Sequence, residues 1–230
     1  MRGFFVTGTD TGVGKTFVAC ALLHAFANRG LRTVGMKPIA AGAVLAGTRL
    51  LNDDVAALRA ASSVSAPEDL VNPYRFGPAI APHIAAAEAG VEIEDERLKR
   101  AYVELAGLAD CVIVEGAGGF RVPLGDRLDM RDLAVRLGLP VILVVGLRLG
   151  CLNHALLTAE SVESAGLQLA GWVANRIDPD MARADENVQA LQTRLRAPLL
   201  AHIPYCGTKD AAPPAWKLDI DLLDASPVLR

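Results

Sequence analysis

The chain has 230 residues, a formal net charge of −3, 52% hydrophobic residues and 21% charged residues. This length and composition exclude a disordered chain and predict one globular domain, residues 1–230, with a large buried core. The weakly acidic balance argues against a nucleic-acid partner and against an anionic membrane surface.

Three features of the sequence predict a cytoplasmic protein. The longest apolar run, residues 140–145, is far too short to span a bilayer. The first strand follows Met1-Arg2-Gly3 directly, so we expect no signal peptide. The cysteines form no C-x-x-C pair and are expected to be reduced thiols; they are Cys20, Cys111, Cys151 and Cys206.

Short β-branched runs alternate with longer amphipathic segments along the chain. The expected strands are residues 4–6, 32–36, 111–114, 141–145, 171–174 and 199–203. The expected helices are a segment beginning at Phe17 and residues 52–61, 92–108, 152–165 and 183–195. Apolar strands separated by helices predict an α/β fold with a mostly parallel central sheet and helices on both faces. Residues 66–82 and the tail from Pro204 are expected to be irregular.

A glycine-rich loop, Gly8-Thr9-Asp10-Thr11-Gly12-Val13-Gly14-Lys15-Thr16, joins the first strand to the first helix. Backbone N–H groups in such a loop, together with the positive helix N-terminus, bind phosphate. Lys15 would reach the terminal phosphates of a nucleotide, and the Thr16 hydroxyl would ligate Mg²⁺. The spacing is irregular, because Thr9 stands where the usual pattern has its first glycine and Gly8 lies one residue earlier. The loop predicts a P-loop fold that binds a nucleoside triphosphate.

Polar residues and glycines follow most of the predicted strands. The carboxyl ends of parallel strands meet at one edge of a sheet, and ligands bind there. We therefore expect these residues to form a common site. They are Lys37, the run from Glu115 to Gly119, Gly146, the run from Gly150 to Asn153, Asn175 and Pro204-Tyr205.

Two acidic positions are candidates for a metal site. Glu115 follows four apolar strand residues, which is where P-loop enzymes keep a carboxylate near Mg²⁺. Asp54 could supply a second carboxylate, since Mg²⁺ prefers oxygen ligands. Asp53 and Asp54 are equally placed by pattern, and either could instead be an acidic residue favoured at a helix start. His83 and His154 have no second ligand at metal-binding spacing.

Lys37 and Asn175 each permit two interpretations. Lys37 could be a solvated charge, or a second ammonium that holds an anionic substrate and stabilises a transferred phosphoryl group. Asn175 could be a turn residue, or an amide that reads a donor and an acceptor on a purine edge.

The loop and its flanking residues, 5–16, resemble the phosphate loop of the dethiobiotin synthetase family, ATP-dependent enzymes of biotin synthesis. Further segments fit the same family in order and spacing, at residues 35–38, 72–74, 81–84, 114–119, 139–158, 171–175 and 203–204. The resemblance extends to about Tyr205 and weakens in the tail.

The resemblance implies a ligase that closes a ureido ring. The diamine 7,8-diaminopelargonate would react with CO₂ to give a carbamate, and ATP would convert the carbamate to a carbamic-phosphoric anhydride. The second amine would then displace phosphate, giving dethiobiotin, ADP and phosphate. Such a reaction needs positioning and charge neutralisation more than a general base.

The resemblance also implies a role for each matching residue. The catalytic residues would be Lys37, Lys15 and Thr11, and Mg²⁺ would be held by Thr16, Asp54 and Glu115. ATP would contact Gly12, Val13, Gly14, Lys15, Thr16, Phe17, Asp54, Glu115, Gly116, Ala117, Gly118, Asn175, Arg176, Pro204, Tyr205 and Cys206. The diamine would contact Ala41, Pro82, His83, Gly150, Cys151, Leu152 and Asn153. The family implies a homodimer in which residues 150–153 of one subunit approach the substrate held by the other.

The chain departs from the family pattern at two positions. Ala41 stands where serine is common and lacks the hydroxyl that would touch substrate, a loss of about 1 kcal/mol. Arg148 replaces a common lysine, which keeps the charge and changes the donor geometry. Two other classes remain as alternatives: a related P-loop ligase or amidotransferase acting on another carboxylate, and a nucleotide-dependent switch without catalysis. A partitioning ATPase is disfavoured because such proteins carry a lysine early in the loop, where this chain has Asp10.

Overall fold

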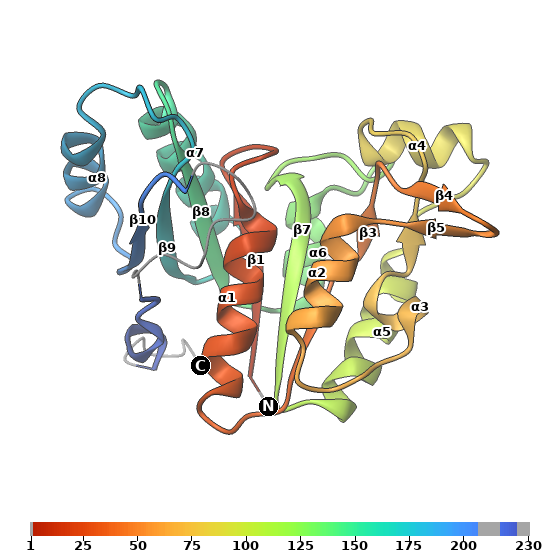
Figure 1. The fold of residues 1–230 in the computed structure, drawn as a ribbon. Helices are drawn as coiled ribbons and strands as arrows, with labels where there is room; N and C mark the ends of the chain where they lie inside the picture. The colour runs from red at the N-terminus through yellow and green to blue at the C-terminus, as the bar shows by residue number, and fades with distance from the viewer. Residues whose placement is uncertain (1, 207–216, 225–230) are drawn as a thin grey trace.

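The computed structural model describes residues 2–206 and 217–224. A six-stranded sheet forms the centre, in the order β10-β9-β8-β1-β7-β2, with every neighbouring pair parallel (Figure 1). The strands are β1 (Arg2–Gly8), β2 (Thr33–Met36), β7 (Cys111–Gly119), β8 (Val141–Leu147), β9 (Leu169–Arg176) and β10 (Leu199–Ile203). The predicted α/β class and all six predicted strands are confirmed.

Helices cover both faces of the sheet (Figure 1). One face carries α1 (Lys15–Ala27) and α2 (Asp53–Ala61). The other face carries α5 (Asp95–Leu108), α6 (Met130–Leu137) and α7 (Cys151–Ser164), with α8 (Ala184–Gln192) packed against α7. The five predicted helices are present, and α6 is an addition. Within the described residues, no helix is both long enough and apolar enough to cross a membrane.

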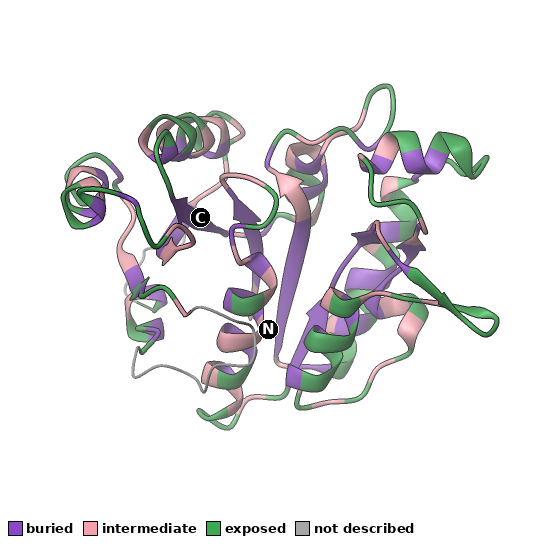
Figure 2. Cartoon of the chain, turned by 45° about the horizontal axis from the view of Figure 1, so that its top comes forward, coloured by how far each residue is buried: buried purple, intermediate pink, exposed green. Residues whose placement is uncertain are grey.

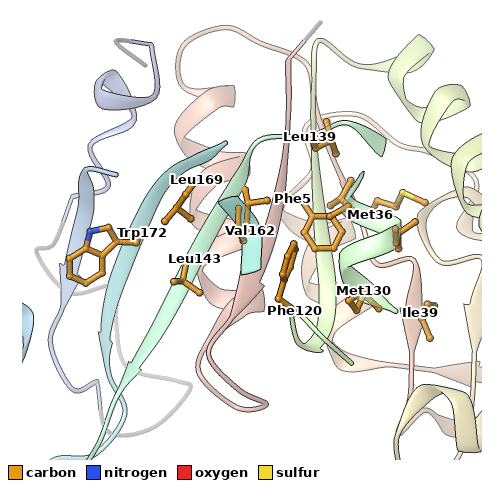
Figure 3. Close-up of a cluster of buried hydrophobic side chains, with 14 of the residues drawn as sticks. Phe5, Met36, Ile39, Phe120, Met130, Leu139, Leu143, Val162, Leu169 and Trp172 are labelled. Atoms are coloured by element: carbon orange, nitrogen blue, oxygen red, sulfur yellow. The ribbon is translucent and has the colours of Figure 1, made fainter. Parts of the chain in front are cut away.

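The central strands are buried on both faces, which explains their unbroken apolar runs. Phe4 and Val6 of β1 pack with α1, and the ring of Phe4 stacks on that of Phe26 at 5.7 Å. Phe5 points to the opposite face and joins a larger cluster that includes Trp172 (Figure 3). Figure 2 shows these buried strands between helices whose outer sides are exposed. The alternation of side chains along each strand therefore fills two cores.

Residues 66–82 are irregular only in part, so the prediction is wrong for the short elements that the segment contains. The segment contains α3 (Glu68–Val71) and β6 (Tyr74–Arg75), and α4 (Pro82–Glu88) begins at its end. β6 pairs in parallel with β3 (Ile39–Ala40), the residues that follow the end of β2. Elements this short carry no readable periodicity, because tertiary packing rather than local preference holds them.

Two other features were not predicted from sequence. β4 (Val44–Ala46) and β5 (Arg49–Leu51) form an exposed antiparallel hairpin that extends from the body of the protein (Figure 2). Helix α6 begins with a reciprocal cap in which the side chains of Asp129 and Asp132 each accept the other's backbone N–H at 3.0 Å. In the tail the structure describes a 3₁₀ turn, η1 (Ile220–Leu223), and the expectation of irregular chain at 207–216 and 225–230 falls outside the described residues.

Candidate active site

The glycine-rich loop runs from the end of β1 to the start of α1. Gly14 has a φ of 93° and occupies the cap position of α1, a left-handed conformation that favours glycine. Gly8 is required for a different reason, since a Cβ there would lie 2.6 Å from a methyl group of Val13. The loop thus folds back tightly on the end of β1.

Thr9 fastens this loop to the neighbouring strand. Its backbone N–H donates to the carbonyl of Val144 at 3.0 Å. Its hydroxyl accepts the N–H of Gly146 at 3.3 Å. A glycine could make the first contact but not the second. The departure from the usual glycine spacing therefore gives the loop a side-chain attachment to β8.

Lys15 lies inside the loop, and its side chain points back toward the loop backbone. Its ammonium donates to the carbonyl of Asp10 at 2.8 Å, and the residue is 6% exposed. Burial, followed by the positive charge of Lys37, lowers the pKa of Lys15 to about 8. The nearby carboxylates act in the opposite direction and do not offset these effects.

A charged cluster lies beside Lys15, where the carboxyl end of β2 meets the middle of β7. The Lys37 ammonium is 2.5 Å from Glu115 Oε1 and 2.9 Å from Asp54 Oδ2. The Thr16 hydroxyl is 2.7 Å from Asp54 Oδ1 and 2.9 Å from Glu115 Oε1, and its single proton can serve one of them at a time. Four residues distant in sequence therefore share one hydrogen-bonded cluster, which we call the charged cluster.

The two carboxylates keep the buried lysine charged. Burial alone would lower the pKa of Lys37, but Glu115 and Asp54 together raise it above its ordinary value. For Asp54, burial disfavours the ionised form, but the charge of Lys37, the hydrogen bonds from Lys37 and Thr16 and the charge of Lys15 together outweigh burial, so the pKa of Asp54 is lowered. The cluster therefore holds a protonated amine against an ionised carboxylate.

The cluster also contains an oxygen that suits a metal ion. Glu115 Oε2 is buried and has no hydrogen-bond partner, which is costly unless a cation binds there. Two carboxylates and a hydroxyl are hard oxygen donors, the set that Mg²⁺ prefers when it keeps several waters. Among the described residues, no group of three or more His, Cys, Asp or Glu side chains could hold a metal. The oxygen donors of Thr16, Asp54 and Glu115 fit Mg²⁺ better than a metal that prefers nitrogen or sulfur ligands.

The glycine-rich segment after Glu115 differs from the prediction. It was expected to follow a strand that ends at residue 114, yet Gly116, Ala117 and Gly118 all belong to β7, which continues to Gly119. The pairing between β1 and β7 shifts register there, with Gly119 opposite Gly8. Small residues let β7 continue alongside the start of the loop, which a turn propensity alone does not reveal.

Asn175 supports the loop from the other side. Its Nδ2 donates to the carbonyl of Val13 at 2.8 Å, and a Cβ at Gly14 would collide with that amide. The neighbouring Arg176 donates to the carbonyl of Pro179 at 3.1 Å. Sequence reasoning treated Asn175 only as a base-reading or turn residue, so its contact with the loop is a new finding.

Of the predicted residues after β10, Pro204 is exposed and Cys206 is half-buried. Tyr205 is exposed, and the thiol of Cys206 donates to the carbonyl of Pro204 at 3.2 Å. All four cysteines are free, in keeping with the expectation of reduced thiols.

The predicted substrate residues lie at the same edge of the sheet but outside the charged cluster. Pro82 begins α4, and His83 Nδ1 is buried with no hydrogen-bond partner. Gly150, in a left-handed conformation, caps α7, which begins with Cys151, Leu152 and Asn153. The two helices stand on opposite sides of β1 (Figure 1). The Ala41 carbonyl accepts the side-chain amide of Asn52 at 3.3 Å.

Asp10 and Arg148 form a contact that sequence reasoning missed. They make an ion pair between the loop and the end of β8. Asp10 Oδ1 also accepts the N–H of Thr11 at 2.7 Å, while Thr11 and Phe17 are themselves exposed. Partners 138 residues apart leave no local signal, so only the fold reveals the contact.

The parallel sheet, the glycine-rich loop and the charged cluster define a P-loop nucleotide-binding protein. Solved structures agree on the fold: septum site-determining protein MinD from Pyrococcus horikoshii, complexed with Mg-ADP, has a TM-score of 0.54 at 21% identity, covering 88% of this chain and 81% of that one. MinD from Aquifex aeolicus has a TM-score of 0.53 at 15% identity, covering 89% and 82%. At this identity the likeness shows the fold alone.

Sequence comparison gives the family. A family model described as an AAA domain matches residues 2–212. The ATP-dependent dethiobiotin synthetase BioD of Aromatoleum aromaticum is 58% identical, covering 94% of this chain and 96% of that protein. The protein of the same name from Nitrosospira multiformis is 57% identical, covering 95% of each. The chain belongs to the family of ATP-dependent dethiobiotin synthetases, which are enzymes of the ligase class. The resemblance found in the motifs is thereby confirmed.

Proposed function

We propose that this protein uses ATP and Mg²⁺ to convert 7,8-diaminopelargonate and CO₂ to dethiobiotin, ADP and phosphate, in the cytoplasm. Residues 1–230 would act as one catalytic domain. The observation that carries the proposal is the position of the Lys37 ammonium. It is buried between Glu115 and Asp54, beside the phosphate loop. A lysine in that place, beside a nucleotide, suits transfer of a phosphoryl group to a small anion.

The proposed reaction has three steps. One substrate amine attacks CO₂ and loses a proton, giving a carbamate. A carbamate oxygen attacks the γ-phosphorus of ATP, the bond to the β-phosphate oxygen breaks, and ADP leaves from a carbamic-phosphoric anhydride. The second amine attacks the carbonyl carbon, phosphate leaves with the bonding electrons, and the ureido ring closes with loss of a proton.

The residues of the chain would bind and orient the reacting groups. Lys15 would exchange the Asp10 carbonyl for phosphate oxygens, and Lys37 would contact the carbamate and the γ-phosphoryl oxygens. Thr11, exposed at the turn of the loop, would lie beside the same phosphate. Thr16, Asp54 and Glu115 would hold Mg²⁺, which supplies positive charge to neutralise the phosphates.

The remaining proposed contacts follow the family pattern. The loop from Gly12 to Phe17, the end of β7 and residues 175–176 and 204–206 would bind ATP. Ala41, Pro82 and His83 would contact the diamine, and residues 150–153 of a second subunit would bind its carboxylate in a homodimer. The unpartnered Nδ1 of His83 and the left-handed turn at Gly150 support these contacts.

An assay of dethiobiotin formation tests the proposal. We expect ADP release to require the diamine, CO₂ and Mg²⁺ together, and each nucleoside triphosphate should be tried in turn. Hydrolysis that ignores the diamine would favour a nucleotide-dependent switch. Turnover with a different carboxylate in place of the diamine would favour a related ligase. Light scattering of the purified protein tests the dimer, and a monomeric mass with full activity would contradict it.

A further inference from the structure

The segment Asn72-Pro73-Tyr74 fits the family pattern but has no part in the proposed function. We propose that Asn72 is a positioning residue: its side-chain amide fixes the backbone of Lys37 and so sets where the Lys37 ammonium can reach. This inference rests on the proposed role of Lys37. Asn72 itself makes no contact with the ammonium, so it acts only through the backbone.

Lys37 lies just beyond the end of β2, the edge strand of the sheet. Its N–H donates to the carbonyl of Val71 at 2.8 Å, and its carbonyl accepts Asn72 Nδ2 at 2.6 Å. The next residue, Pro38, has no N–H to offer. Val71 and Asn72, two consecutive residues of another segment, therefore satisfy the backbone N–H and carbonyl of Lys37, as a neighbouring strand would inside a sheet.

Asn72 is fully hydrogen-bonded, and its amide can point only one way. The residue is 2% exposed, and Nδ2 also donates to the carbonyl of Tyr74 at 2.9 Å. Oδ1 accepts Arg75 Nε at 2.9 Å. A flipped amide would place its oxygen against two carbonyls and its nitrogen against a guanidinium. The partners thus fix the orientation without ambiguity.

Arg75 is held as firmly as the amide it orients. Its NH1 donates to the carbonyl of Leu50 at 3.1 Å and pairs with Glu68 Oε1 at 2.5 Å. The backbone N–H of Asn72 also donates to the carbonyl of Glu68, at 2.8 Å. Asn72 is therefore braced from both sides, which is the arrangement expected of a group that must hold another in place.

The position of the Lys37 backbone matters because a lysine side chain is long and flexible. Its ammonium must meet Glu115 and Asp54 at 2.5 and 2.9 Å from a single Cα position. A displacement of about 1 Å in a reacting group can cost about 100-fold in rate. An anchor on the Lys37 carbonyl limits such displacement while the side chain stays free to turn toward substrate.

The substitution Asn72→Asp tests this inference, because it keeps the size and removes both donors. We expect kcat to fall by about 10- to 100-fold, with ATP affinity measured by calorimetry unchanged. Ser63→Ala is the matched control, since Ser63 Oγ accepts the N–H of Thr33 at 2.7 Å at the opposite end of β2. That variant should lose thermal stability and keep wild-type kcat. An equal loss of kcat in both variants would show a merely structural effect and overturn the proposal.

Combining Asn72→Asp with Lys37→Gln gives a readout that general destabilisation would not change. If Asn72 acts through Lys37, adding Asn72→Asp to the Lys37→Gln variant should lower kcat no further. Additive losses would overturn the proposal. Wild-type turnover in Lys37→Gln alone would refute the proposed function of Lys37, whereas wild-type turnover in Asn72→Asp alone would refute only the positioning role.

Arg75→Lys provides a second test that does not depend on the folding of Asn72→Asp. It keeps a positive charge near Glu68 and removes the Nε donor that orients Asn72. We expect a smaller fall in kcat than in Asn72→Asp, again without change in ATP affinity. If Asn72→Asp does not fold, Arg75→Lys decides the question. An unchanged kcat in Arg75→Lys would then overturn the proposal.

Discussion

Two ion pairs join the segments of β2 and β7, one at each end of β2 and in opposite surroundings. The two strands pair in register from Thr33 and Cys111 onward. At the amino ends, Arg32 and Asp110 meet at 2.8 Å with side chains 59% and 40% exposed. Just beyond the carboxyl end of β2, Lys37 meets Glu115 of β7 at 2.5 Å with side chains 6% and 1% exposed. The same register therefore produces one pair in water and one in the protein interior.

The two ion pairs differ in what they contribute to the stability of the fold. An exposed ion pair contributes little to folding, and losing it is inexpensive. Burying a lysine and a glutamate costs several kcal/mol of desolvation per ion, which their attraction recovers only with good geometry. An apolar pair of similar size would stabilise the strands as well or better. Stability alone therefore does not explain the buried pair.

The largest effect should come from removing the buried ammonium. Lys37→Gln keeps a polar side chain of similar length and loses the positive charge, so we expect turnover to fall by about 1000-fold. ATP binding, measured by calorimetry, should largely persist because the loop is untouched. The matched change at the other end, Arg32→Gln, should leave turnover unchanged. Equal turnover in both variants would contradict the contrast between the two ends.

The second effect concerns folding. Lys37→Met leaves Glu115 buried without its cation, so the free energy of unfolding at neutral pH should fall by about 3 kcal/mol. Adding Glu115→Gln should recover much of the loss, because no buried charge then remains unpaired. Urea unfolding of both variants measures this, with Arg32→Met as the exposed control. A large loss in Arg32→Met, or no recovery in the double variant, would contradict the argument.

Lys15 offers a third test, because it is buried beside the same cluster without a carboxylate in hydrogen-bond contact. Its pKa is lowered to about 8, so at pH 9 most of the free protein has a neutral Lys15. Phosphate favours the ammonium, so ATP binding at pH 9 should take up a proton. Affinity should weaken by up to about tenfold per pH unit above 8.

Calorimetry in two buffers of different ionisation enthalpy measures that uptake. Lys15→Met has no amine to protonate and serves as the control, with weaker binding and no proton uptake at this pH. Binding to the wild-type protein without proton uptake at pH 9 would show that Lys15 is already charged in the free protein.

Contiguous features of the site could be predicted from the sequence. The loop from Gly8 to Thr16 is one segment. Lys37 follows β2 and Glu115 follows the apolar run of β7, and the parallel pairing of these strands brings the two residues together. Asp53 and Asp54 could not be separated by pattern, because both suit a helix start. The structure directs the Asp54 carboxylate toward Thr16 and Lys37.

Other features depend on contacts across the fold and left no local pattern. The brace between Asp10 and Arg148 and the contact of Asn175 with the loop join distant segments. Small elements such as α3 and β6 are held by packing against β2 and by pairing with β3, respectively. Helix α6 was also not predicted, although the spacing of Asp129 and Asp132 is a local pattern that suits its reciprocal cap.

The smallest effect belongs to the exposed pair. Hydrogen bonds from Arg32 lower the pKa of Asp110 from 3.8 to about 2. A lowered pKa gives a contribution to stability that is complete above about pH 4 and is lost as the pH falls toward 2. Asp110→Asn removes this contribution, so the difference in melting temperature from the wild-type protein should shrink between pH 4 and pH 2. Arg32→Met should behave alike, because it removes the other partner. A difference in melting temperature that stays constant across this range would mean that the pair does not hold Asp110 ionised. The exposed pair would then contribute no pH-dependent stability, and the comparison with the buried pair would fail on this point.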